Sequence, residues 1–416
     1  MTTLNDDNHA LNNEMLEKAL EVALFTPQAG GAWGLPLILE GGVGIGKSSK
    51  LARLATKHRM QFEKILVPSR APEDFSGVLI PDGHGGATQT VFLKAVREIL
   101  KREAVTPNQA TILLLDELNW AGKALQGALL GPFLDRLVGD VALPPSVRII
   151  AAGNPAQDAE GGTVLIPPLA NRLAWFDSQT PPMLEWEAYL RNPSPVPVPT
   201  DAFTTEQKVR NNWSRHWGNV LEVTLSYTKV AGNHHMPPKG NPQRNRAWPS
   251  PRSWEMAMRA ATTARILGHE EVIGDIVAGC VGRAAALGWL EAYSGLNLPD
   301  PSVVLKARKW EPTNRIDRDA AVYRAAVNYA LQLDQKLREE KDGKQQPPKA
   351  IIDAWALVAY GIDSPLIDSC MPCASTLLQA GFTADNHRLP SETAQQIQRV
   401  LLRLGRSGLS RYAVPS

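Results

Sequence analysis

Short apolar runs and amphipathic helical patterns alternate along the first half of the chain. Loop-forming residues bound each of the apolar runs, which span 37–39, 65–67, 112–115 and 147–152. Between them, apolar residues recur three and four positions apart, which is helical periodicity, over 47–57, 91–102 and 122–137. A further amphipathic helix is expected within residues 1–35. Buried strands that alternate with helices are typical of a parallel α/β sheet.

The second half of the chain has a different pattern, which begins after the proline-rich segment 193–199. Each proline there fixes its own φ and keeps the preceding residue extended. From residue 252 onward no segment alternates like a strand, and helical patterns cover 254–267, 270–293, 319–341, 349–359 and 392–404. A charged, proline-containing run at 338–349 interrupts them. We therefore expect three domains: an α/β core over 1–200, a helical lid over 201–335 and a helical C-terminal extension over 336–416.

The composition is that of a globular protein, with 44% hydrophobic and 21% charged residues among 416. Lys and Arg total 44 against 42 Asp and Glu, a net charge of +2 that argues against a dedicated nucleic-acid-binding protein. No apolar run approaches the roughly 18 residues of a membrane span. The acidic start does not resemble a secretory signal, and three cysteines cannot form a disulfide framework. We therefore expect a cytoplasmic protein.

The segment 41–48, GGVGIGKS, matches the phosphate-loop pattern in the context that this pattern requires. It follows an apolar run and opens a helical stretch. Its glycines let the backbone N–H groups turn toward an anion at a helix N-terminus. We expect Lys47 to contact the β- and γ-phosphates and the Ser48 hydroxyl to bind Mg²⁺. The predicted nucleotide-binding residues are Gly41, Gly42, Val43, Gly44, Ile45, Gly46, Lys47, Ser48 and Ser49.

Two further apolar runs end in polar residues suited to phosphate chemistry. The segment 111–119, TILLLDELN, ends in Asp116, which can hold Mg²⁺, and Glu117, which can deprotonate an attacking water. The segment 147–155, VRIIAAGNP, ends in Asn154, whose amide can bond both that water and a γ-phosphate oxygen. An Asn-Pro pair can equally well begin a turn.

Two arginines follow these motifs. Arg172 lies in 169–176, LANRLAWF, which favours a short helix, and its guanidinium could stabilise charge on a transferred phosphoryl group. Arg252 lies in 248–253, WPSPRS, at the entry to the helical half. It could reach back over the nucleotide of its own chain or simply cap the helix that follows.

Taken in order, these elements resemble those of AAA+ ATPases, and the similarity is greatest to the MoxR family. The segment 68–81, PSRAPEDFSGVLIP, is similar to the stretch where that family begins its helix-2 insert, and 128–139 resembles the helix after its Walker B strand. The resemblance implies an AAA+ P-loop core with a parallel sheet and a helix-2 insert, followed by a helical lid. It implies ATP and Mg²⁺ as cofactors. It also implies metal binding by Ser48 and Asp116, catalysis by Glu117, sensor 1 at Asn154, a trans-acting arginine finger at Arg172 and sensor 2 at Arg252.

The same resemblance implies a ring, commonly hexameric, because Arg172 would complete only a neighbour's site. ATP hydrolysis would drive the remodelling or activation of a partner, and MoxR-type ATPases are typically paired with a protein that has a von Willebrand factor A domain. The client protein is not identified by any residue here. Two other functions stay open: an ATP-gated assembly scaffold with negligible turnover, and a nucleic-acid motor or loader, which the near-neutral charge disfavours.

Overall fold

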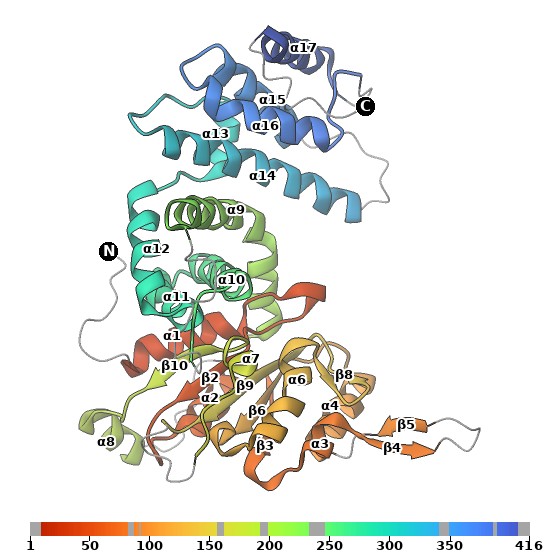
Figure 1. Cartoon of the computed structure of the whole chain (residues 1–416), viewed down its shortest axis with the longest axis vertical. Helices are drawn as coiled ribbons and strands as arrows, with labels where there is room; N and C mark the ends of the chain where they lie inside the picture. Colours follow the sequence, from red (N-terminus) through yellow and green to blue (C-terminus); the bar gives the residue numbers. More distant parts are fainter. Residues whose placement is uncertain are drawn as a thin grey trace. The chain divides into compact units, whose positions relative to one another are not determined.

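A computed structural model describes residues 10–81, 87–90, 93–155, 162–191, 199–232, 246–340, 349–385 and 389–406 (Figure 1). The chain divides into two compact units. The first unit comprises residues 1–211 and 232–290, and the second comprises residues 212–231 and 291–416. Helices α9 (Ala202–Val230) and α12 (Arg283–Leu296) each contribute residues to both units.

The first unit contains a six-stranded sheet in the order β1-β10-β2-β9-β6-β3, and every neighbouring pair is parallel. Its strands are β1 (Ala10–Leu11), β2 (Leu37–Glu40), β3 (Gln61–Leu66), β6 (Thr111–Asp116), β9 (Val147–Gly153) and β10 (Ala174–Ser178). Two antiparallel hairpins accompany it, β4 (Val78–Pro81) with β5 (Ala87–Thr90) and β7 (Leu137–Val138) with β8 (Val141–Ala142). The predicted parallel sheet is confirmed, while β1 and β10 were not predicted.

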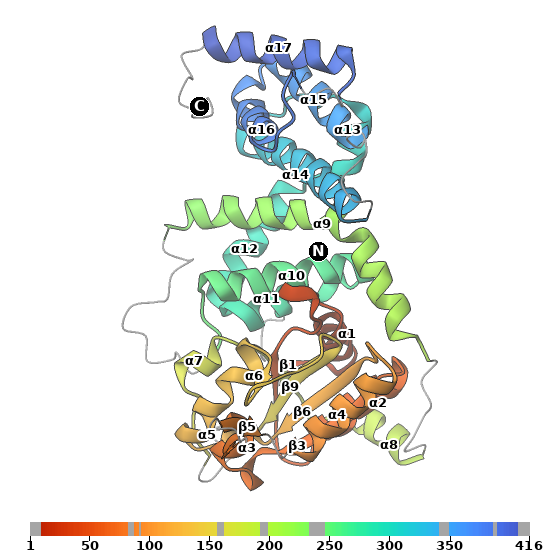
Figure 2. The same ribbon diagram turned by 90° about the vertical axis from the view of Figure 1, so that its right-hand side faces the viewer.

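Helices cover both faces of this sheet (Figures 1 and 2). The helices of the first unit, besides the parts of α9 and α12, are α1 (Asn13–Leu24), α2 (Lys47–Lys57), α3 (Pro72–Ser76), α4 (Lys94–Val105), α5 (Lys123–Ala128), α6 (Leu130–Leu134), α7 (Pro167–Ala170), α8 (Met183–Arg191), α10 (Pro251–Leu267) and α11 (Ile273–Val281). The helix expected over 122–137 is divided into α5 and α6. Pro132 explains the division, because it has no N–H to donate to the carbonyl four residues earlier.

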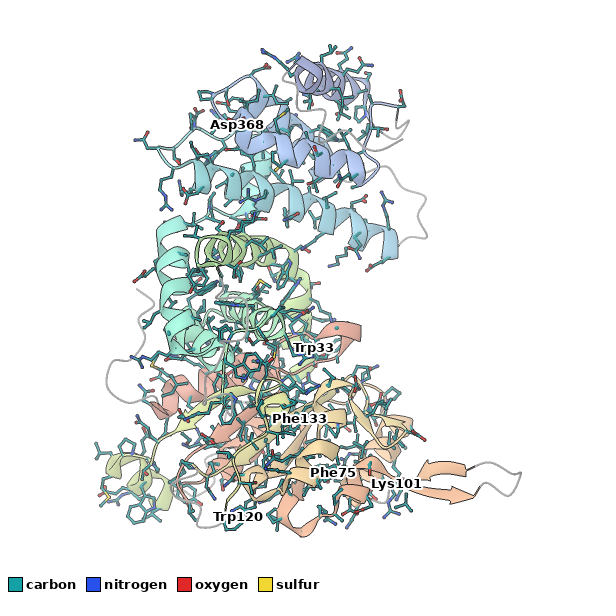
Figure 3. The ribbon with its side chains drawn as sticks, in the orientation of Figure 1. Trp33, Phe75, Lys101, Trp120, Phe133 and Asp368 are labelled. Atoms are coloured by element: carbon teal, nitrogen blue, oxygen red, sulfur yellow. The ribbon has the colours of Figure 1, made fainter. Side chains whose placement is uncertain are left out.

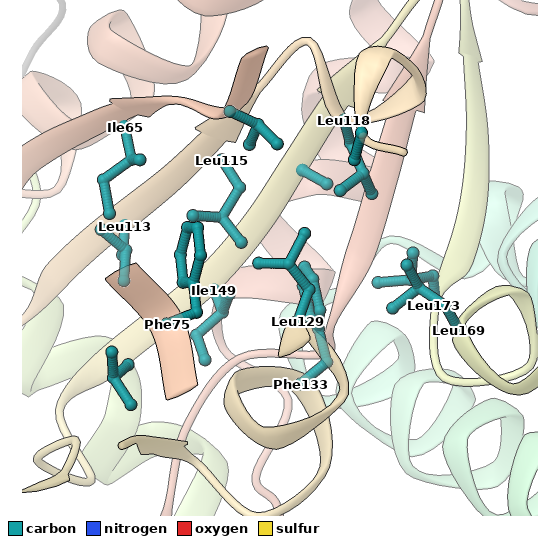
Figure 4. Close-up of a cluster of buried hydrophobic side chains, with 14 of the residues drawn as sticks. Ile65, Phe75, Leu113, Leu115, Leu118, Leu129, Phe133, Ile149, Leu169 and Leu173 are labelled. Carbon is teal, nitrogen blue, oxygen red and sulfur yellow. The ribbon is translucent and has the colours of Figure 1, made fainter. Parts of the chain in front are cut away.

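One face of the sheet packs on a continuous apolar core (Figures 3 and 4). Leu113 and Leu115 of β6 and Ile149 of β9 meet Phe75 of α3 and Phe133 of α6 in this cluster, and all five are buried. Side chains alternate between the two faces of a strand. Ile112, Leu114 and Asp116 of β6 therefore face the opposite side, where α2 packs against β3 and β6.

Helix α11 packs directly on the edge region of the sheet at β10. Gly279 makes this approach possible, because a Cβ at that position would lie 2.6 Å from the carbonyl oxygen of Trp175. The single helix expected over 270–293 is interrupted after α11. Gly282 has a φ of +85° there, which ends the helix.

The second unit is helical, as expected from its sequence. Its helices are α13 (Pro301–Ala307), α14 (Ile316–Glu340), α15 (Lys349–Ile362), α16 (Ile367–Gln379) and α17 (Ser391–Arg406), together with the later part of α9 and the end of α12. Helix α14 packs on α15 and α16, and α15 also packs on α17. Cys370 and Cys373 are buried within α16, and burial raises the pKa of both thiols. These thiols are therefore core residues.

Candidate active site

The loop between β2 and α2 folds around glycines that other residues could not replace without strain. Gly44 and Gly46 have φ values of +78° and +87°, in the left-handed region. At Gly41 the restriction is space, since a Cβ would lie 2.6 Å from the carbonyl oxygen of Ser178. Gly46 is the N-cap of α2, and no side chain caps the first turn of this helix in the described structure. The first N–H groups of α2 and the helix dipole thus form a site for an anion.

Lys47 brings this loop together with the end of β9. Its buried ammonium donates hydrogen bonds to the carbonyl oxygens of Gly41 at 2.7 Å and Gly42 at 2.8 Å, and to Oδ1 of Asn154 at 2.8 Å. Strands β2 and β9 are parallel neighbours, so their carboxyl ends lie at the same edge of the sheet. The predicted residues Lys47 and Asn154 therefore meet at one point.

Asp116 ends β6 at the same edge and joins Ser48. The Ser48 hydroxyl donates to Oδ2 of Asp116 at 2.8 Å, and the backbone N–H of Glu117 donates to Oδ1 at 3.1 Å. The Lys64 ammonium, from β3, also lies 2.5 Å from Oδ2. A serine hydroxyl beside a carboxylate is a donor set that suits Mg²⁺, which prefers oxygen ligands.

Glu117 follows directly in an uncommon backbone conformation. Its φ is +59° and its ψ is +43°, and its side chain is exposed. The left-handed region costs a residue with a Cβ about 1 to 2 kcal/mol. Such strained residues persist where the surrounding structure fixes them, and they cluster at active sites. Here the buried neighbours Asp116 and Leu118 fix the backbone on either side of an accessible carboxylate.

Asn119 positions Asn154, a role that the sequence analysis missed. The Asn119 side-chain oxygen accepts the backbone N–H of Asn154 at 3.0 Å, and its own carbonyl accepts the N–H of Thr163 at 2.7 Å. Asn119 is buried, and its Nδ2 has no hydrogen-bond partner among the described residues. The only sequence signal was its place in the run 111–119, two residues after Glu117.

Arg246 is a second residue that the sequence analysis did not place at this edge. Its guanidinium pairs with Glu40 of β2 at 3.0 Å and with Asp177 of β10 at 2.6 Å, and it lies over the Trp175 ring. Burial raises the pKa of Glu40 to about 7 despite this ion pair. Glu40 immediately precedes the phosphate loop, so Arg246 connects the chain before α10 to the start of that loop. The basic residues before it, 233–245, lie outside the described residues.

Arg172 and Arg252 lie near each other and away from Lys47. Arg172 lies in the turn between α7 and β10 rather than on a helix, and its Nη1 donates to the carbonyl oxygen of Pro168 at 2.6 Å. Burial and the nearby guanidinium of Arg252 lower the pKa of Arg172. The Asn171 side chain donates to the Trp248 carbonyl and accepts from the Ser250 hydroxyl, which holds the start of α10 there.

These two arginines lie at the opposite end of the strands from the phosphate loop. Arg172 precedes β10, whereas Lys47 follows β2, and the two strands are parallel neighbours. The structure thus brings together Lys47, Ser48, Asp116 and Asn154 with Glu117 beside them. It does not bring Arg172 or Arg252 to that group.

A comparison with known protein families bears on this arrangement. Residues 36–173 match the model of the AAA domain, dynein-related subfamily. The chain contains an AAA+ domain. The match begins just before β2 and ends just before β10, so it includes the phosphate loop, Glu117, Asn154 and Arg172. The predicted fold class, an AAA+ α/β core with a parallel sheet followed by helices, is confirmed.

Similarity to individual proteins is more remote. A crystal structure of a candidate ATPase from Cytophaga hutchinsonii matches with 16% identity and a TM-score of 0.46, over 68% of this chain and 90% of that one. No curated protein sequence matches the chain significantly.

Ser48 and Asp116 could hold Mg²⁺ only together with further ligands, which a bound nucleotide and water would supply. Within the described ranges, no three His, Cys, Asp or Glu side chains are grouped so that they could hold a metal ion. Mg²⁺ is usually held by one or two protein oxygens together with waters and substrate phosphates. Ser48 and Asp116 provide such oxygens beside the open turn of α2. Separately, none of the described helices is long and apolar enough to cross a membrane.

Proposed function

We propose that the chain hydrolyses ATP as a MoxR-type AAA+ ATPase. The observation that carries this proposal is the convergence of Lys47, Ser48, Asp116 and Asn154 at one edge of the sheet. The match of residues 36–173 to the AAA domain supports it. The preference for ATP is an expectation of the family, because no described residue identifies the base.

Each residue of the site has a part in this reaction. The amides of the phosphate loop bind the β- and γ-phosphates, and Lys47 exchanges the carbonyls of Gly41 and Gly42 for phosphate oxygens. Ser48 and Asp116 hold Mg²⁺, which neutralises phosphate charge when it is bound. Glu117 accepts the proton of the attacking water.

Asn154 orients that water against the γ-phosphate. The side-chain oxygen of Asn119 keeps Asn154 in position by accepting a hydrogen bond from the backbone N–H of Asn154. Because Lys47 already contacts the Asn154 side chain, a γ-phosphate bound by Lys47 would lie within reach of the same amide.

We propose that the reaction is completed by a second copy of the chain. Arg172 is remote from its own phosphate loop, and it lies beside a second guanidinium group, that of Arg252. The two guanidinium groups repel each other, and the nearby carboxylate of Asp135 has a smaller effect on Arg172 than Arg252 has. A further anion would therefore stabilise the pair. The γ-phosphate of an adjacent copy is such an anion. In this proposal Arg252 acts beside Arg172, and the copies form a ring, commonly hexameric.

The wider role is the remodelling or activation of a partner protein in the cytoplasm, with residues 201–335 as the lid and 336–416 as an extension. A protein with a von Willebrand factor A domain is the proposed partner, because it accompanies MoxR-type ATPases. The resemblance of 68–81 and 128–139 to that family supports this assignment.

Hydrolysis by Glu117→Gln, compared with the wild type, tests the proposed activity. The variant should bind ATP with wild-type affinity and release phosphate at least about 100-fold more slowly, because it lacks the general base. Phosphate release and the binding of a fluorescent ATP analogue are the two measurements. If the wild type also shows no turnover but assembles with ATP, the chain is an ATP-gated scaffold. If its hydrolysis requires DNA or RNA, it is a nucleic-acid motor.

A further inference from the structure

Lys64 forms an ion pair with the carboxylate proposed to hold Mg²⁺. Its ammonium lies 2.5 Å from Oδ2 of Asp116, the same oxygen that accepts the Ser48 hydroxyl. The phosphate-loop pattern and the apolar run of β6 give no hint of this residue, since it comes from β3. Lys64 is therefore the third partner of the Asp116 carboxylate, after the Ser48 hydroxyl and the Glu117 N–H, and the proposed reaction requires this carboxylate to bind Mg²⁺.

The register of the sheet holds Lys64 at this place. Lys64 is paired with Leu114 and Leu66 with Asp116, in parallel strands. Paired residues of neighbouring strands share a face, and side chains alternate along each strand. Lys64 therefore lies on the face of Leu114 and Asp116, which α2 covers, and a different pairing would move it to the opposite face.

Exposure differs between the two partners. The Asp116 side chain is only 10% exposed, whereas that of Lys64 is 44% exposed. The carboxylate is thus fixed, while the lysine has a flexible stem with access to solvent. Lys64 can leave Asp116 without any change in the strands.

A lysine ammonium and a magnesium ion compete for the same carboxylate oxygen. Both are cations, so each disfavours the other at close range, and the effect is strong where the surroundings are mostly buried. Lys64 opposes a metal ion that arrives alone. Nucleotide phosphates carry enough negative charge to offset the repulsion and to draw the metal into place.

We propose that Lys64 is a tethered cation that takes the place of Mg²⁺ on Asp116 until a nucleotide brings the metal. It makes the binding of metal and nucleotide cooperative. This inference rests on the proposed nucleotide site and concerns the regulation of that site.

The test uses the full-length protein and two measurements. The first is the binding of Mn²⁺ without nucleotide, measured by electron paramagnetic resonance. The second is the binding of fluorescent ADP at increasing Mg²⁺ concentrations. Lys64→Met removes the charge and keeps most of the stem. It should bind Mn²⁺ about tenfold more tightly than the wild type, as expected when one nearby charge is removed. It should also need less Mg²⁺ for half-maximal ADP binding.

Lys101→Met is the matched control. Lys101 lies on α4, is labelled in Figure 3, and pairs with Glu98 on the surface rather than with a residue of the site. It should leave both measurements unchanged. Lys64→Arg keeps the charge, so it should retain the weak metal binding of the wild type. Thermal melting shows whether each variant is folded.

Two results would overturn the inference while leaving the nucleotide site intact. In the first, Lys64→Met binds Mn²⁺ no more tightly than the wild type and has the same Mg²⁺ requirement. In the second, it loses nucleotide affinity at every Mg²⁺ concentration, which would make Lys64 a phosphate ligand. A wild-type protein that binds no nucleotide at all would instead contradict the proposed function.

Discussion

Glu40 illustrates how burial at the carboxyl edge of the sheet changes the charge of a single residue. The side chain is only 12% exposed, and its pKa is raised to about 7 although Arg246 lies 3.0 Å away. Burial disfavours the charged form more than the arginine favours it. Glu40 therefore takes up a proton near neutral pH, one residue before the phosphate loop.

This raised pKa predicts how stability depends on pH. Between about pH 4.5 and pH 7 the unfolded chain ionises Glu40 and the folded chain does not, so the free energy of unfolding falls as pH rises through that window. Glu40→Gln removes this dependence. The stability of the wild type relative to Glu40→Gln should be lower at pH 8 than at pH 5, by up to about 3 kcal/mol.

Urea unfolding at the two pH values measures this difference. Glu98→Gln serves as the control. The ion pair with Lys101 lowers the pKa of Glu98, so the contribution of Glu98 to the free energy of unfolding stays nearly constant between pH 5 and pH 8. A relative stability of the wild type that rises from pH 5 to pH 8 would mean that the pair with Arg246 dominates, contrary to this prediction.

At the residue scale, the sequence predicted the groups that motifs or strand ends mark. Lys47, Ser48, Asp116 and Asn154 all belong to this class, and they lie together. Asn119, Lys64 and Arg246 could not be predicted, because their roles depend on register and on packing between segments that are distant in sequence. No local pattern distinguishes such residues from ordinary polar ones.

At the scale of elements, the contact between α11 and β10 depends on the absence of a side chain. A Cβ on Gly279 would lie 2.6 Å from the Trp175 carbonyl oxygen and 3.0 Å from the Phe176 ring. A backbone atom cannot move aside as a flexible side chain can. The fit of α11 on the sheet therefore requires glycine at this position.

Gly279→Ala should destabilise the protein by about 1 to 3 kcal/mol, the usual cost of overpacking. Gly127→Ala is the matched control, since it changes a helical glycine of α5 that has nothing within 4 Å of the added Cβ. That control should be neutral or stabilising by up to about 1 kcal/mol, because alanine favours helices. The denaturant midpoints of the wild type and the two variants measure these changes. Equal changes in the midpoint at the two positions would refute the packing argument.

The sequence predicted the elements that have a long or regular pattern and missed those that do not. Three of the apolar runs fall within β2, β6 and β9, whereas the run 65–67 covers only the last two residues of β3 and extends one residue beyond it. Strand β10 is short and follows the helix-like letters LANRL, which explains why Arg172 was placed on a helix. Helix α9, with 29 residues, was not predicted because polar residues interrupt the apolar positions along it. The first part of α9 is attached to the sheet by an ion pair between Glu206 and the buried Arg148 of β9.

For the whole molecule, the important feature is the separation of two charged groups by the length of the strands. The phosphate loop, Asp116 and Asn154 occupy the carboxyl edge of the sheet, and Arg172 lies before β10 at the other end. A single AAA+ domain therefore has a nucleotide site at one end and an arginine pair at the other. In the function proposed here, the nucleotide site of one copy is completed by the arginine pair of another.

The most direct test of this claim is a mixing experiment with two inactive variants. Lys47→Ala loses the phosphate contact and keeps the arginine, whereas Arg172→Ala keeps the nucleotide site and loses the arginine. Each alone should hydrolyse ATP at a small fraction of the wild-type rate. An equimolar mixture should recover about a quarter of that rate, because one in four junctions of a randomly assembled ring combines an intact nucleotide site with a neighbour's Arg172. A mixture no more active than its components, or Arg172→Ala alone as active as the wild type, would contradict the account.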